Sequence, residues 1–467
     1  MTFPAYPAYR HSGVEWLGVV PKHWGVKQLR YLGRFRKGLT ITKADLTDTG
    51  IPCLNYGEVH SLYPFEVNQD IHPLKCVPAE YLETDPSACV KYGDFVFADT
   101  SEDLDGVGNF THVSGMEPLF AGYHTIIYSL NSEVSSRFLA YCLESFAFRT
   151  PLRMGVKGVK VFSVTQEILR GGIAWLPTTA EQTQIARFLD HETARIDALI
   201  EEQQRLTELL KEKRQAVISH AVTKGLDPTV PMKDSGVEWL GEVPAHWVIS
   251  QLKFNTLEMQ TGPFGSQLHA EDYVDGGTPL VNPAHMIDGE IIPDPQVSVD
   301  EVTWQRLKRH ALTAGDIIFA RRGELGRCAI VTNEQEGWLC GTGSLRATLN
   351  VRLDAEYAYL LITSKGVVAE LSLESKGSTM ENLNTETLGR IRLPLPTISE
   401  QKAILEYVHE VSGQFKALVD AAESGISLIT ERRSALISAA VTGKIDVRGW
   451  QPPASAQAPE LAVAEAD

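Results

Sequence analysis

The chain has 467 residues, 43% of them hydrophobic and 22% charged, a composition typical of a globular protein with two to four domains. Its formal net charge of −16 argues against a protein whose whole surface attracts nucleic acid. It has no apolar run near the roughly 18–20 residues needed to span a bilayer, and residues 1–9 lack a signal-peptide pattern, so we expect a cytoplasmic protein without a membrane partner.

The first predicted element is a box that the chain repeats. Ser12–Gly18 and Ser235–Gly241 both have the sequence Ser-Gly-Val-Glu-Trp-Leu-Gly, and both continue to Pro-x-His-Trp. Over residues 12–24, 11 of 13 positions are identical at an offset of 223. Repeats are the first signal to seek in a sequence, and this one predicts two tandem units. We expect the box tryptophans to pack structurally.

The segments after the two boxes do not resemble each other overall, and both predict mixed α/β structure. Gly93–Ala98 and Gly315–Ala320 each indicate a turn followed by a short buried strand. Amphipathic helices are predicted at 137–149 and 356–372. The six cysteines, at 53, 76, 89, 142, 328 and 340, form no Cys-x-x-Cys pair, so we expect reduced thiols and no structural metal.

A second repeated block closes each unit. Glu181-Gln182 matches Glu400-Gln401 at an offset of 219, and each pair begins a long helical pattern. Apolar residues recur every seven positions, with Leu199 and Leu206 as predicted d positions of the first helix. The predicted a positions are Leu189, Ile196, Gln203, Leu210 and Val217 in the first helix, and Val408, Phe415, Ala422, Ile429 and Leu436 in the second.

We therefore predict an α+β protein with two mixed α/β domains, at 1–179 and 224–398, in a pseudo-two-fold arrangement. Two long antiparallel helices, at 180–223 and 399–446, separate them and form an intramolecular coiled coil. Residues 447–467 are expected to be a disordered tail. Two alternatives stay open: each apolar stripe packs on its own domain, or Gly413 and Gly425 interrupt the second helix.

These motifs resemble the specificity subunits of type I restriction-modification systems. The repeated box, the Leu-Pro-x-Pro-x-x-x-Glu-Gln approach at Leu393–Gln401 and the Gly-Asp-Ile-Ile-Phe-Ala-Arg-Arg-Gly run at Gly315–Gly323 carry the resemblance. It implies two target-recognition domains, each of which binds one half of a bipartite double-stranded DNA target. It also implies that the helices set the spacer and help to dock two modification (methyltransferase) subunits, and that restriction subunits join the full complex.

Catalytic motifs are missing from the sequence. It contains no Asn/Asp-Pro-Pro-aromatic motif, no phosphate-binding Gly-x-x-x-x-Gly-Lys-Ser/Thr loop and no His-Glu-x-x-His. We expect a non-catalytic subunit without a cofactor of its own, while the resemblance places S-adenosylmethionine on the modification subunit. The alternatives are a two-fold scaffold or adaptor that does not bind DNA and, as a third class, an autonomous nuclease or methyltransferase.

Candidate DNA contacts are basic or amide residues near glycines, because arginine suits guanine and phosphate while asparagine suits adenine. In the first domain they are Arg34, Arg36, Lys37, Lys157 and Lys160. In the second domain they are Arg321, Arg322, Arg327, Lys376, Ser378, Thr379, Asn382 and Asn384. For each of these residues the alternative is a solvated surface loop.

Overall fold

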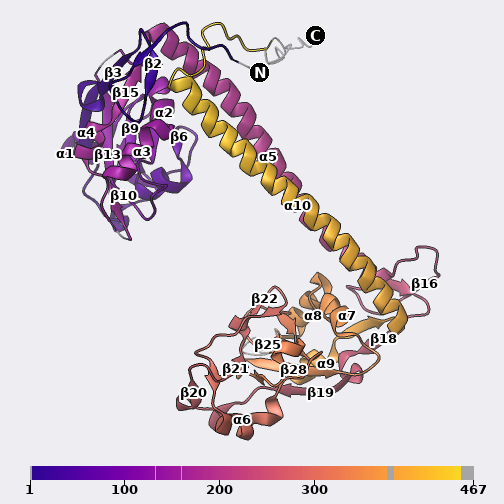
Figure 1. The fold of residues 1–467 in the computed structure, drawn as a ribbon. Helices are drawn as coiled ribbons and strands as arrows, with labels where there is room; N and C mark the ends of the chain where they lie inside the picture. Colours follow the sequence, from indigo (N-terminus) through magenta and orange to yellow (C-terminus); the bar gives the residue numbers. More distant parts are fainter. Residues whose placement is uncertain (1–2, 132, 159, 376–382, 454–467) are drawn as a thin grey trace, which may run out of the picture. The chain divides into compact units, whose positions relative to one another are not determined.

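The structure is a computed structural model that describes residues 3–131, 133–158, 160–375 and 383–453. The chain divides into two compact units, shown as a ribbon in Figure 1. Unit 1 consists of Met1–Gln204 and Ser424–Asp467, and unit 2 of Arg205–Glu423. Each unit contains one mixed α/β domain, here head 1 (residues 3–178) and head 2 (residues 225–397), with parts of both long helices.

The two long helices are α5 (Thr179–Lys224) and α10 (Ile398–Val441), close to the predicted ranges. Gly225 and Gly443 follow them with φ of +79° and +72°, as expected for glycines that terminate helices. The second helix was predicted to reach residue 446 and ends earlier for this reason. Gly413 and Gly425 do not interrupt α10.

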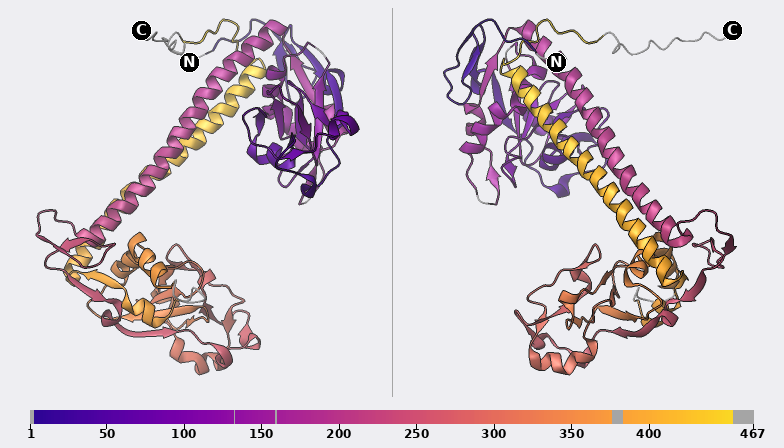
Figure 2. Two further views of the ribbon diagram at one scale, coloured as in Figure 1. Left: turned by 180° about the vertical axis from the view of Figure 1, so that it is seen from behind. Right: turned by 45° about the vertical axis from the view of Figure 1, so that its right-hand side comes forward.

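Within each unit, α5 and α10 run antiparallel and side by side, as both views in Figure 2 show. In unit 1, Nε of Arg433 lies 2.7 Å from Oδ1 of Asp197. In unit 2, Nζ of Lys211 lies 3.9 Å from Oε1 of Glu423. The pairing is thus seen separately in both units.

The helix seam differs from the predicted one. Leu189 and Ile196 are buried as predicted, but Leu199 and Leu206 are 46% and 43% exposed. The small side chains of Thr193 and Thr207 are buried instead, 5% exposed each. Thr193 is buried beside Tyr141 of head 1, whose hydroxyl it contacts, so the predicted d positions Leu199 and Leu206 are not the most buried positions of α5.

Head 1 contains two main sheets. The first is five-stranded, with order β4-β13-β9-β11-β6, and the second is four-stranded, with order β7-β5-β12-β8. Two-stranded pairs join β1 with β2, β10 with β14 and β15 with β3. The strands are β1 (Tyr9–His11), β2 (Val19–Pro21), β3 (Gly25–Gln28), β4 (Gly33–Lys37), β5 (Ile51–Leu54), β6 (Phe65–Val67), β7 (Cys76–Val77), β8 (Cys89–Val90), β9 (Phe95–Ala98), β10 (Thr100–Ser101), β11 (Phe110–Val113), β12 (Leu119–Ala121), β13 (Thr125–Leu130), β14 (Phe162–Ser163) and β15 (Ile173–Leu176).

Head 2 repeats this plan with four strands in each main sheet. The sheet orders are β19-β28-β25-β26 and β20-β24-β21-β27. Pairs join β16 with β17, β18 with β29 and β22 with β23. The strands are β16 (Met232–Asp234), β17 (Glu242–Pro244), β18 (Val248–Gln251), β19 (Thr256–Thr261), β20 (Tyr273–Val274), β21 (Thr278–Val281), β22 (Met286–Ile287), β23 (Glu290–Ile291), β24 (Ser298–Val299), β25 (Ile317–Ala320), β26 (Cys328–Ile330), β27 (Leu339–Cys340), β28 (Ser344–Leu349) and β29 (Arg392–Leu395).

Each amphipathic helix predicted in a head is a pair of helices. The break falls at Ser145 in head 1 and at Ser364 in head 2, both buried. Oγ of Ser145 donates to the carbonyl of Cys142, which ends the first helix of that pair. The α-helices of the heads are α1 (Tyr81–Thr84), α2 (Ser136–Glu144), α3 (Phe146–Gly155), α4 (Gln166–Gly171), α6 (Glu301–Leu307), α7 (Ala355–Ile362), α8 (Lys365–Ser375) and α9 (Thr385–Arg390).

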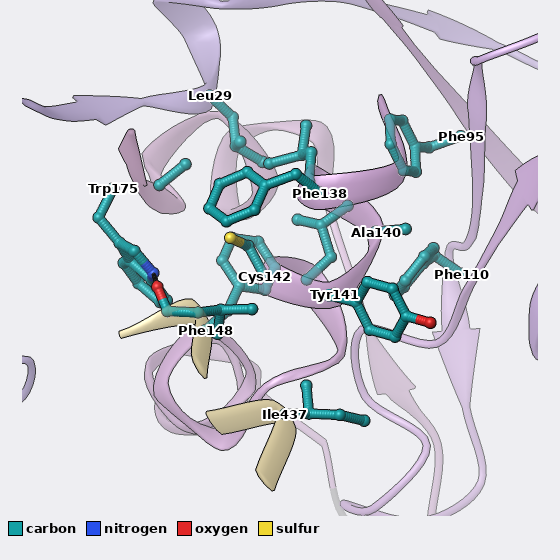
Figure 3. Close-up of a cluster of buried hydrophobic side chains, with 14 of the residues drawn as sticks. Leu29, Phe95, Phe110, Phe138, Ala140, Tyr141, Cys142, Phe148, Trp175 and Ile437 are labelled. Carbon is teal, nitrogen blue, oxygen red and sulfur yellow. Dashed lines mark hydrogen bonds between the residues drawn. The ribbon is translucent and has the colours of Figure 1, made fainter. Parts of the chain in front are cut away.

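The core of each unit includes the end of a long helix. In unit 1, Ile437 of α10 joins the cluster that contains Tyr141, Phe148 and Trp175 (Figure 3). The indole Nε1 of Trp175 donates to the carbonyl of Val441. In unit 2, Ile218 and Val222 of α5 join the core, and the hydroxyl of Tyr357 donates to the carbonyl of Val222 over 2.8 Å. The ends of both long helices are thus part of the domain cores.

The repeated boxes contact the repeated Glu-Gln pairs. Nε2 of His23 lies 2.8 Å from Oε2 of Glu181, and Nε2 of His246 lies 3.1 Å from Oε2 of Glu400. Each glutamine bonds the backbone of its own head: Gln182 bonds Ser135 and Pro177, and Gln401 bonds Asp354 and Pro396. The repeats therefore encode the attachment of each head to its helix.

The first residues of the segment expected to be a disordered tail are packed in unit 1. Val447 is fully buried in the unit 1 core, and Trp450 packs edge-on against Phe188 at 5.3 Å between ring centroids. Residues 454–467 lie outside the described residues. In the described ranges, none of the helices combines the length and apolarity needed to cross a membrane.

Candidate nucleic-acid interface

One backbone junction occurs in both heads, where the first main sheet meets two other chain segments. In head 1, Gly38 N–H donates to Thr125 O, Asp99 N–H to His124 O, and Val164 N–H to Asp99 O. In head 2, Gly262 N–H donates to Ser344 O, Arg321 N–H to Gly343 O, and Leu383 N–H to Arg321 O. Junction 1 comprises Lys37–Ile41, Asp99, Tyr123–Thr125 and Ser163–Glu167; junction 2 comprises Thr261–Phe264, Arg321, Thr342–Ser344, Leu383 and Asn384.

Glycines permit the close backbone approach at each junction. A Cβ on Gly38 would lie 2.2 Å from the carbonyl oxygen of Gly122, and one on Gly262 would lie 1.9 Å from that of Gly341. Real Cβ atoms essentially never approach other atoms this closely. The two heads therefore share one backbone frame, whose framing glycines exclude side chains at these points.

Junction 1 borders a cleft of about 640 Å³. Lys37, Thr40, Asp99, His124 and Gln166 are among its lining residues. Nδ1 of His124 lies 3.2 Å from Oδ1 of Asp99, and the imidazole side chain is 60% exposed. The cleft thus presents a cation, a carboxylate, an imidazole and an amide on one surface.

Junction 2 has different side chains on the same frame. Nε of Arg321 donates to the carbonyl of Leu383 over 3.2 Å, which fixes the side chain beside that segment. Arg322 is exposed. Phe264 is 61% exposed in a loop between Gly262 and Gly265. This junction combines guanidinium groups with an aromatic ring, both of which suit contacts with nucleic acid.

The predicted contacts of head 1 fall into two groups. Arg34, Lys157 and Lys160 are exposed, and Lys37 lines the cleft of junction 1. Arg36 is turned inward: it donates to Oδ2 of Asp94 at 3.1 Å and to Oγ of Ser129 at 2.8 Å. Burial lowers the pKa of its guanidinium, although Asp94 opposes that effect. Because its guanidinium donates hydrogen bonds within head 1, Arg36 is not a candidate for DNA contact.

The predicted contacts of head 2 also divide. Arg321 and Arg322 lie at or beside junction 2, whereas Arg327 bonds Oε2 of Glu324 at 2.8 Å and lines a separate cavity of about 390 Å³. Oδ1 of Asn384 accepts from the amides of Glu386 and Thr387 and caps α9. Lys376, Ser378, Thr379 and Asn382 lie outside the described residues.

Asp94 and Asp316 explain why both heads carry a Gly-Asp turn before the central strand. Asp94 binds Arg36 of β4, and Oδ2 of Asp316 lies 3.4 Å from an Nη atom of Arg346 in β28. The arginine comes from a different strand in each head.

Because the heads differ in sequence, comparing them does not align these arginines. For the same reason, Asp99, His124 and Phe264 were missed as candidate contacts. The 219-residue offset, which aligns Gly122–Thr125 with Gly341–Ser344, was the signal that could have located His124.

Comparisons with known proteins agree on one family. Residues 264–419 match the family described as "Type I restriction modification DNA specificity domain". The MjaVIII specificity subunit of Methanocaldococcus jannaschii is 24% identical over 326 residues, which cover 68% of this chain and 72% of that protein. The EcoKI specificity subunit of Escherichia coli K12 is 21% identical over 449 residues, which cover 93% and 91%.

Two solved structures share the fold. The HsdS subunit from Thermoanaerobacter tengcongensis matches with a TM-score of 0.51 and 16% identity, over 91% of this chain and 98% of that chain. A chain from a structural study of assembly and conformational transition in the type I R-M system matches with a TM-score of 0.60 and 17% identity, over 91% and 99%. The α+β plan of two mixed heads and two long helices is thus common to these chains.

Proposed function

Because the chain belongs to the family of type I restriction-modification specificity subunits, we propose that it recognises a bipartite double-stranded DNA target, one half-site per head. The observation that carries the proposal is the repeated junction. Its backbone frame is the same in both heads, while the exposed side chains are Lys37 and His124 in one and Arg322 and Phe264 in the other. A common frame with different side chains suits two heads that recognise different base sequences.

Charge limits how DNA is held. The net charge of −16 gives the whole chain no general attraction for a polyanion, so local groups at the junctions have to act with basic surfaces on partner subunits. We assign base contacts to the chain and much of the phosphate contact to the modification subunits. Affinity for DNA is therefore a property of the complex, and sequence preference is a property of the heads.

Exposed leucines on the helices support the docking of two modification subunits. Leu199 and Leu428 are 46% and 67% exposed in unit 1, and Leu418 and Leu209 are 54% and 52% exposed in unit 2. Leu199 and Leu418 are equivalent at the 219-residue offset, as are Leu209 and Leu428. Each unit thus presents one exposed leucine from each helix at equivalent positions, which suits two copies of one partner.

The chemistry resides on the partners in this proposal. The modification subunits bind S-adenosylmethionine and methylate DNA, restriction subunits join the full complex, and the chain itself contributes no catalytic group. The long helices set the number of unread base pairs between the half-sites.

The test uses the chain co-purified with its modification subunit. Methylome sequencing of the host identifies the candidate target, and a gel-shift assay then compares that target with a duplex in which either half-site is scrambled. We expect tight binding to the intact target only, with loss of preference on scrambling either half. Equal binding to all duplexes would favour the alternative of a scaffold that does not recognise sequence.

A further inference from the structure

His124 has a left-handed backbone, with φ of +55°. Within the described ranges two other non-glycine residues share this feature, Phe65 at +76° and Asp288 at +50°. Phe65 packs against Tyr141 and beneath the guanidinium of Arg137, and Asp288 forms the tip of the β22–β23 hairpin with Gly289, a turn that requires positive φ. Neither explanation applies to His124, which lies between β12 and β13 of different sheets.

In head 2 the equivalent position is a glycine whose φ lies outside the left-handed region, so the shared hydrogen-bond frame does not itself require positive φ there. Gly343 is the equivalent residue, because its carbonyl accepts from Arg321 N–H as the carbonyl of His124 accepts from Asp99 N–H. The His124 side chain belongs to no buried cluster and is 60% exposed. Its imidazole contacts the Asp99 carboxylate and lies nearly perpendicular to the Tyr123 ring, with 6.1 Å between the ring centroids. A strained conformation with an exposed side chain points to a role outside folding.

We infer that His124 is a base-contacting residue of head 1 and that Asp99 is its positioning residue; the inference rests on the proposed function. The carboxylate engages Nδ1, which orients the ring and leaves Nε2 to bond a base edge in the major groove. Lys37, Thr40 and Gln166 line the same cleft and supply neighbouring polar groups. The alternative role, a phosphate contact, fits Lys37 better, because its ammonium is a flexible point charge.

The central test compares His124→Gly with Asp288→Gly in the complex with the modification subunit. Both variants relieve a left-handed backbone, so we expect each to unfold at the wild-type temperature or above it. Only His124→Gly is expected to relax base discrimination, by about tenfold at one or two positions of one half-site. The other half-site should be unchanged, as measured by methylation frequencies over a randomised target library.

Asp99 is tested by two variants. Asp99→Asn keeps size but weakens the bond to Nδ1, so the same base positions should lose part of their discrimination, and Asp99→Glu should restore some of it. Full discrimination in His124→Gly would overturn the inference, and so would a loss of affinity that is equal on all sequences. Lack of sequence preference in the wild-type complex would instead refute the proposed function itself.

Discussion

Nε of Arg137 donates to Oδ1 of Asp190 over 2.7 Å, and this bond joins α2 of head 1 to α5. At the 219-residue offset the equivalent residues in unit 2 are Glu356 and His409, and Nε2 of His409 contacts Oε1 of Glu356. The polarity is reversed: the head supplies the cation in unit 1 and the anion in unit 2. Each head is thus attached to its helix by one polar contact, and the head contributes a basic side chain in unit 1 and an acidic side chain in unit 2.

Removing the Asp190 carboxylate is expected to destabilise unit 1. Arg137 is partly buried, and although burial opposes its charge, Tyr141, Asp190 and Glu66 hold the pKa of its guanidinium above the usual value. Asp190→Asn leaves that cation partly unpaired, so we expect a loss of about 1–3 kcal/mol in the free energy of unfolding. Urea denaturation measures it. Glu356→Gln, which removes the more exposed pair in unit 2, should cost under about 1 kcal/mol. Equal losses would contradict the role given to Arg137.

Stability should fall with acidity because of His112. Burial, and next the nearby Arg137, lower the pKa of its imidazole to about 4. Between about pH 6.5 and 4, His112 is therefore protonated in the unfolded chain but not in the folded chain. The free energy of unfolding thus decreases as pH falls through this window. Thermal unfolding from pH 7 to 4 should show a shallower decline in His112→Gln. An unchanged decline in this variant would assign the acid sensitivity to other groups.

Substitution of a junction glycine should destabilise its head. A Cβ on Gly38 would lie 2.2 Å from one backbone carbonyl oxygen and 2.8 Å from another. Backbone atoms cannot move aside as the end of a flexible side chain can. We expect Gly38→Ala to lose roughly 1–3 kcal/mol. The control is Gly57→Ala, whose Cβ meets nothing within 4 Å and whose φ is −63°. Equal stability of the two variants would show that the junction is looser than its geometry implies.

Charge on the helix leucines should block docking of one modification subunit. Leu199→Asp with Leu428→Asp alters unit 1 alone, and both side chains are exposed, so the fold should persist. Native mass spectrometry is expected to find one modification subunit in place of two. Leu62→Asp, at a 66% exposed leucine of head 1, is the control and should retain two. If the double variant still binds two modification subunits, docking does not depend on these leucines.

The sequence predicted the parts of the fold that repeat. The boxes around His23 and His246 and the Glu-Gln pairs were recognised as matching blocks, and the structure shows that they bind each other. The helix range was also predictable, because apolar spacing and terminal glycines are local signals. The seam was not, since Leu199 is more apolar than Thr193 and only the folded structure shows that the smaller residue is the buried one, next to Tyr141 of head 1.

The candidate site was predictable only in part. Arg321, Arg322 and Lys37 were selected by charge and neighbouring glycine, and they lie at or beside the junctions. The same criterion selected Arg36, whose side chain binds Asp94 in the fold. Charge patterns cannot separate these cases because the partner is distant in sequence. His124 and Asp99 are 25 residues apart and carry no motif, so their pairing depends on the sheet crossing.

The proposal that the helices set the spacer is tested most directly by shortening both together. Deletion of residues 200–206 and of the equivalent 419–425 removes one heptad from each helix, about 10 Å at 1.5 Å per residue, and keeps the four exposed leucines assigned to docking. This length corresponds to about three base pairs. Methylome sequencing should then find both half-sites unchanged and the spacer shorter by about three base pairs. An unchanged spacer, or altered half-sites, would contradict the account.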